Sequence, residues 1–276
     1  MILLVENLIE KQLHTEQVLL LVIFLIFLTA LLFFSMTLFK KVRRIKKRRQ
    51  KKLYQDNIDE ILFSFLFSNK EIESILKSES FNNHINNPLY KRVAIKSIIS
   101  LHNNYSGNYS TRLEQFYSES GLAQYSMEKL NSEKWKFVVE GIRDLSGMNY
   151  VKAYQKIQYL KDHRNSLVQT EALLGMIKLQ GLQELFKFRK SSIYLNDWIQ
   201  SNILYMVKKF NIPAPPDLHE LLDSKNESLA LLTIRLITHY KLVVHYDALF
   251  SFHQHTTNSR LKQEINVGLK KLEQIH

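Results

Sequence analysis

The sequence predicts an all-α fold, with one N-terminal transmembrane helix followed by an α-solenoid of antiparallel helix pairs. Three observations support this prediction. Residues 18–39 form an uncharged apolar run, the apolar side chains after it recur with helical spacing, and a polar cap residue recurs about every 30 residues. Only seven Gly and four Pro occur in 276 residues, which argues against β folds and their many tight turns.

The apolar run 18–39 has the length of a membrane span. Its 22 residues would reach about 33 Å as a helix, and the apolar core of a bilayer is about 30 Å thick. The run is longer than the apolar core of a signal peptide, and no small-residue cleavage pattern precedes Lys40. We therefore expect an uncleaved anchor and not a signal peptide or a buried core helix.

The two flanks of this run carry opposite charge. Residues 1–17 contain three Glu and one Lys, whereas residues 40–52 contain ten Lys or Arg and no acid. The positive-inside rule then predicts a single-pass protein of the cell inner membrane. Residues 1–17 are expected outside and a domain of residues 53–276 in the cytoplasm.

The basic run also explains most of the net charge of +12. Ten of the 38 basic residues lie in it, so the remaining 28 nearly balance 26 acids and leave +2. We expect contact with anionic lipid headgroups and no nucleic-acid partner. The expected membrane-surface residues are Lys40, Lys41, Arg43, Arg44, Lys46, Lys47, Arg48 and Arg49.

After Leu53 the apolar residues follow the i, i+3, i+4, i+7 pattern of amphipathic helices, as in 58–67, 89–101 and 135–145. The repeat within this region is a polar cap with apolar residues three and seven positions later. The helix that each cap begins is expected to pack on a shorter helix before it. The expected caps are Asn86, Ser132, Asn165, Ser192, Asn226 and Asn258.

This region resembles HEAT-repeat proteins. The clearest copies are Leu160–Leu179, Leu221–Tyr240 and Phe252–Leu272, each with a helix end, a turn containing Asp or Asn and an apolar second helix. The resemblance covers roughly residues 86–272 and departs from the family's Val-Arg pair, which becomes Val168-Gln169 and Leu261-Lys262. It implies a protein-binding scaffold without catalytic residues. A non-repetitive helical bundle is the alternative fold.

The sequence contains no recognisable catalytic motif. It lacks cysteine, Gly-rich phosphate loops, a G-x-S-x-G elbow and H-E-x-x-H. The concentration of His239, His245, His253 and His255 is better explained as turn residues than as a metal site. We expect no enzyme activity, no cofactor and no metal.

Aromatic residues are the candidate contacts. Tyr105, Tyr109 and Tyr117 surround an irregular, polar segment at residues 103–126, expected to be either a partner-contact loop or flexible filler. Trp135 and Trp198 are expected to pack between repeats, with an exposed binding anchor as the alternative.

These features predict a membrane-anchored HEAT-like scaffold or adaptor that binds a protein partner at the cytoplasmic face of the membrane. The alternative is a regulatory subunit of a membrane enzyme or transporter that senses lipid or a second messenger.

Overall fold

The computed structural model describes residues 2–68 and 71–274, with side chains from residue 19 onward. These described residues form helices and contain no strand, which confirms the all-α prediction. The chain divides into two compact units, Met1–Glu60 and Ile61–His276. Each unit is described by itself.

The first unit belongs to helix α1, which runs from Ile2 to Phe67 and continues into the second unit. The apolar run and the basic run are therefore parts of one continuous helix. By length and composition, α1 is the one helix among the described residues that could cross a membrane, and none of its apolar window is buried. Either a membrane anchor or a signal sequence has this composition.

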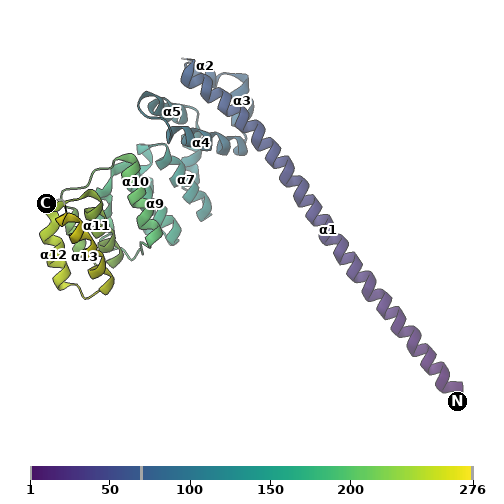
Figure 1. Ribbon diagram of the computed structural model, residues 1–276. Helices are drawn as coiled ribbons and strands as arrows, with labels where there is room; N and C mark the ends of the chain where they lie inside the picture. Colours follow the sequence, from purple (N-terminus) through teal and green to yellow (C-terminus); the bar gives the residue numbers. More distant parts are fainter. Residues whose placement is uncertain (1, 69–70, 275–276) are drawn as a thin grey trace. The chain divides into compact units, whose positions relative to one another are not determined.

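The second unit contains the end of α1 and twelve further α-helices, labelled in part in Figure 1. The α-helices are α2 (Ile72–Leu76), α3 (Glu79–Ile85), α4 (Pro88–His102), α5 (Asn108–Glu119), α6 (Leu122–Lys129), α7 (Trp135–Gly147), α8 (Tyr154–Tyr159), α9 (Ser166–Gln180), α10 (Asp197–Phe210), α11 (Glu227–Tyr240), α12 (Tyr246–His255) and α13 (Ser259–Glu273). Five short 3-10 helices connect them: η1 (Val151–Ala153), η2 (Leu160–Asp162), η3 (Leu182–Phe188), η4 (Leu218–Asp223) and η5 (Val243–His245).

The contacts between helices follow the order of the chain. The longer helices touch in the series α4, α7, α9, α10, α11 and α13. Shorter elements pack beside them: α6 on α7, α8 and η2 on α9, η4 on α11, and α12 on α13. The core consists of the apolar faces of these helices, such as Val138, Ile142 and Leu145 of α7, which are buried as the helical spacing predicts.

Three of the expected caps are confirmed. The Oδ1 atoms of Asn165, Asn226 and Asn258 accept hydrogen bonds from backbone N–H groups in the first turns of α9, α11 and α13. Asn satisfies these N–H groups because its side-chain oxygen lies beside the backbone of the two or three residues that follow it.

The other three expected caps are wrong. Helix α4 is capped by Asn87 and not by Asn86, because Pro88 takes the first helical position. Ser132 precedes α7 by three residues, and its Oγ accepts from the Lys134 N–H instead. Helix α10 begins at Asp197 with Asn196 as its cap, four residues after Ser192.

The segment 103–126 is also not the irregular loop that its polar composition predicts. It contains α5 and the first part of α6. Leu113, Phe116 and Tyr117 are buried on one face of α5 with i, i+3 and i+4 spacing. The segment is therefore part of the packed domain.

Candidate interaction surfaces

The three expected partner-contact tyrosines differ in exposure. Tyr105 and Tyr109 are exposed, at 37% and 40% of their surface. Tyr117 is fully buried, and burial raises the pKa of its hydroxyl strongly. Tyr117 is therefore a core residue and was wrongly predicted as a surface contact.

Tyr105 and Tyr109 belong to an exposed group of four aromatic rings, which we name the aromatic cluster: Phe63, Phe67, Tyr105 and Tyr109. The ring of Phe67 lies 4.9 Å from Phe63, 6.2 Å from Tyr105 and 5.5 Å from Tyr109, centroid to centroid. The two tyrosine rings are 5.7 Å apart. Phe63 and Phe67 are 65% and 47% exposed. Contiguous exposed aromatic rings of this kind are typical of protein interfaces.

The residues beside this cluster hold the last turn of α1 in place. Arg112 of α5 donates from Nη2 to the Phe65 carbonyl at 2.7 Å, and its guanidinium lies 4.7 Å above the Phe65 ring. A cation beside the last carbonyls of a helix also interacts favourably with the helix dipole. Arg112 thus fixes the turn that carries Phe63 and Phe67.

A cleft of about 500 Å³ adjoins Arg112 and is lined in part by Glu71, Glu73 and Glu119. Glu73 forms an ion pair with Lys77, and Glu119 accepts a hydrogen bond from Gln115. These carboxylates form no acid–base pair with one another, so the cleft has a charged rim and no evident chemistry.

The two tryptophans are on the surface. Trp135 is 37% exposed and Trp198 is 63% exposed, so the expected packing between repeats is wrong for both. Trp135 is the first residue of α7 and is exposed at that helix end, although Val138 and Ile142 on the same face are buried. Trp198 is the second residue of α10 and lies outside the buried face of that helix. Trp198 shares its exposed face of α10 with Tyr205, which is 62% exposed.

The face of α10 next to Trp198 borders a second cleft, of about 410 Å³, between α10, α11 and α13. An ion-pair network closes one side of it. Arg235 pairs with Asp197 at 2.9 Å and with Glu264 at 3.1 Å, and Arg260 pairs with Asp197 at 2.7 Å. The two arginines lower the pKa of the Asp197 carboxyl, with the Arg235 hydrogen bond as the largest cause.

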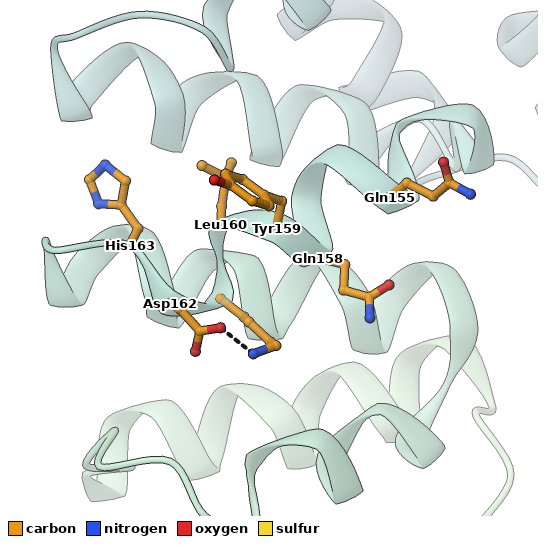
Figure 2. Close-up of a pocket in the computed structure, with 7 residues that line it drawn as sticks. Gln155, Gln158, Tyr159, Leu160, Asp162 and His163 are labelled. Carbon is orange, nitrogen blue, oxygen red and sulfur yellow. Dashed lines mark hydrogen bonds and ion pairs between the residues drawn. The ribbon is translucent and has the colours of Figure 1, made fainter.

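A third cleft, of about 470 Å³, lies along α8 and η2 (Figure 2). Lys161 and Asp162 form an ion pair in it, while Gln155 and His163 lie at opposite ends of the view. Tyr159 is 86% exposed there. The ring of His163, also in the lining, accepts the backbone N–H of Asn165 at its Nδ1.

The histidines do not converge. Within the described residues, no three His, Cys, Asp or Glu side chains are placed to hold a metal ion. His245 instead stacks on His219 with ring centroids 4.7 Å apart, and burial followed by the charge of His219 lowers its pKa. His253 and His255 lie in the last turn of α12.

The basic run 40–52 is exposed throughout its length in α1. The eight expected membrane-surface residues are all on the helix surface, on every side of it. The contact of these side chains with lipid stays a prediction.

Comparisons with known proteins add little to this description. No known protein family matches the chain, and no curated protein sequence matches it. One similar solved structure is that of an engineered protein from the Northeast Structural Genomics Consortium. It is 14% identical, covers 79% of this chain and 96% of its own length, and superposes with a TM-score of 0.35. A similarity this low carries no argument about fold or function.

Sequence reasoning missed Phe63 and Phe67 as members of the aromatic cluster. They are four residues apart, a spacing that places both on one face of a helix. The buried side chains Ile61, Leu62, Phe65 and Leu66 occupy the other positions of that stretch, so the exposed pair could have been found by drawing the helix face.

Proposed function

We propose that this chain is a membrane-anchored scaffold or adaptor, in which a HEAT-like α-solenoid binds a protein partner at the cytoplasmic face of the inner membrane. The aromatic cluster carries the proposal. Its four large rings are exposed and lie side by side, with Phe67 in contact with each of the other three. Exposed aromatic groups are the usual anchors of protein interfaces.

The order of helix contacts supports the solenoid part of the proposal. Each longer helix from α4 onward touches the next longer helix in the chain, and each of them except α10 also touches a shorter element that precedes it. Nearest-neighbour packing of this kind is expected of helix-pair repeats, in which each unit buries its apolar face against its neighbours.

The charge distribution supports the orientation. Residues before the apolar run carry net negative charge and residues 40–52 carry ten positive charges, which favours a cytoplasmic domain and contact with anionic headgroups. A tether of this kind raises the effective concentration of the scaffold near membrane partners.

Photo-crosslinking tests the partner. The photoreactive residue p-benzoylphenylalanine replaces Tyr105 or Tyr109 in the full chain expressed in cells, and Tyr159 is the matched control because it is an exposed tyrosine outside the aromatic cluster. We expect a discrete crosslinked species from positions 105 and 109 and none from position 159. Crosslinking that is equal at all three positions, or absent at the first two, would refute the proposal.

The absence of native cysteine makes the topology directly measurable. A single cysteine at Thr15 or at Ser251 can be labelled in intact cells with a maleimide that does not cross membranes. We expect labelling at position 15 before lysis and at position 251 only after lysis. The reverse pattern would place the helical domain outside.

A further inference from the structure

Helix α10 presents a strip of aromatic and basic side chains, which we name the α10 strip: Trp198, Tyr205 and Lys209. Trp198 and Tyr205 are seven residues apart and lie on one face, each more than 60% exposed. The Lys209 ammonium lies 5.8 Å from the centre of the Tyr205 ring.

The strip continues onto α9 through Phe210. The Lys178 Nζ lies 4.6 Å from the Phe210 ring centre, and the Lys209 Nζ lies 5.6 Å from the same ring. Two ammonium groups therefore flank one aromatic ring. Burial, and then repulsion from Lys209, lowers the pKa of Lys178 from 10.5 to about 8.

Three lysines on the helices around the strip lack carboxylate partners. Among the described residues, Lys178, Lys209 and Lys271 form no ion pair with an acid. The neighbouring acids are already neutralised, since Asp197 pairs with two arginines and Glu264 pairs with Arg235. The uncompensated charge here is positive.

The cleft between α10, α11 and α13 lies beside the strip. Ser201, one turn from Trp198, lines it together with Leu204, Thr238 and Lys271. These side chains offer apolar contact, hydroxyl groups and a cation within a recess of about 410 Å³, whose lining also includes Asp197 and Glu264, each paired with Arg235. A protruding side chain of a peptide can enter such a recess, whereas a flat layer of lipid headgroups cannot.

We propose that the α10 strip and the adjoining cleft bind an acidic segment of a protein partner. Aromatic or large aliphatic side chains of that segment pack on Trp198 and Tyr205, and its carboxylates approach Lys178, Lys209 and Lys271. This rests on the proposed scaffold function and specifies the chemistry of one partner segment. A carboxylate near Lys178 would favour its protonated form and offset the repulsion from Lys209.

The test uses the full chain in phosphatidylcholine nanodiscs and a phage-displayed library of random 12-residue peptides. We expect enriched peptides to be net acidic and to contain Trp, Phe, Tyr or Leu. Synthetic copies of these peptides should bind about tenfold more weakly to Trp198→Ala and to Lys209→Glu, as expected for a hot-spot residue and a reversed charge. Tyr159→Ala is the matched control, because it removes an exposed tyrosine far from the strip in sequence, and it should leave binding unchanged.

Three results would overturn the inference. The first is enrichment of basic or neutral peptides, or no enrichment at all. The second is acidic peptides that bind equally well to Trp198→Ala. The third is a combined result: no peptide depends on the strip, and Trp198→Ala binds phosphatidylserine vesicles more weakly than the wild type. That result would make a lipid bilayer the occupant of the strip. A crosslink from Tyr105 that persists in Trp198→Ala would then show that the scaffold function stands although this surface fails.

Discussion

Asn226 makes more contacts than a helix cap needs, and its replacement by Ala is the most informative perturbation of the domain. Its Oδ1 accepts from the backbone N–H of Ser228 at 3.1 Å and of Leu229 at 3.3 Å, which caps α11. Its Nδ2 donates to the Ser191 carbonyl at 3.1 Å and to the Ile193 carbonyl at 2.7 Å. The side chain thus joins the start of α11 to the segment before α10.

These contacts determine how much stability Asn226→Ala is expected to lose. Loss of an Asn cap costs about 1 kcal/mol. Each hydrogen bond to a carbonyl contributes about 0.5–1.5 kcal/mol, and the carbonyls left behind are partly buried. Asn226→Ala should therefore lower the free energy of unfolding by about 2–4 kcal/mol. Asn258→Ala should cost only about 1 kcal/mol, because Asn258 caps α13 and its amide reaches only the exposed Glu227.

Urea titration of the full chain in detergent, followed by tryptophan fluorescence, measures both variants, because Trp135 and Trp198 lie in the helical domain. Asn226→Asp separates the two roles, since Asp keeps the cap acceptor and loses the amide donor. We expect it to lower the free energy of unfolding by at least about 1–3 kcal/mol, because a carboxylate oxygen in place of Nδ2 would face the Ser191 and Ile193 carbonyls. Equal losses in Asn226→Ala and Asn258→Ala, or wild-type stability of Asn226→Asp, would refute the bridging role.

The same titration tests three further changes. Gly141→Ala should lower the free energy of unfolding by about 1–3 kcal/mol, because its Cβ would lie 2.8 Å from the Ser126 carbonyl oxygen and force α6 from α7. An unchanged urea midpoint would contradict this close approach. Lys129→Met should lower the free energy of unfolding by about 3–5 kcal/mol, because it leaves the buried Asp144 without the ammonium that lies 2.6 Å away. Adding Asp144→Asn should recover part of that loss, and no recovery would show that lost packing is the cause. Lys178→Met should raise the free energy of unfolding by about 2–3 kcal/mol at pH 7, since the pKa of Lys178 is lowered to about 8 in the folded protein. In the wild type, stability should rise between about pH 8 and 10.5, where the unfolded chain binds more protons than the folded one; an equal rise in Lys178→Met would refute this cause.

Helical periodicity predicted the helices well, because spacing records which face is buried. The expected stretches 89–101 and 135–145 lie within α4 and α7. Helix α10 ends at Phe210, where Asn211 adopts a left-handed conformation with φ of 49° and a proline-rich segment follows. These signals are local, so a single sequence contains them.

The misplaced caps and tyrosine have a different cause. Ser192 fits the cap pattern, yet the chain after η3 forms a turn and then an irregular segment up to Asn196, which accepts from the Ile199 N–H instead. Polar composition suggested a loop around Tyr117, whereas three apolar residues in α5 suffice to bury one face. Which of several residues able to cap a helix does so depends on contacts with other helices. Local composition does not reveal those contacts.

The exposure of Trp198 could not be read from its residue type, since a tryptophan in a helix is buried more often than not. Its neighbours decide the matter: Ile199, Ile203 and Val207 already fill the inner face of α10, so Trp198 and Tyr205 are left on the other side. Burying one such ring contributes about 1.5–3 kcal/mol, a gain that the isolated domain forgoes at both positions. The stability of the domain therefore does not explain why Trp198 and Tyr205 are exposed beside unpaired lysines, whereas a partner that covers them does. The same argument applies to the aromatic cluster.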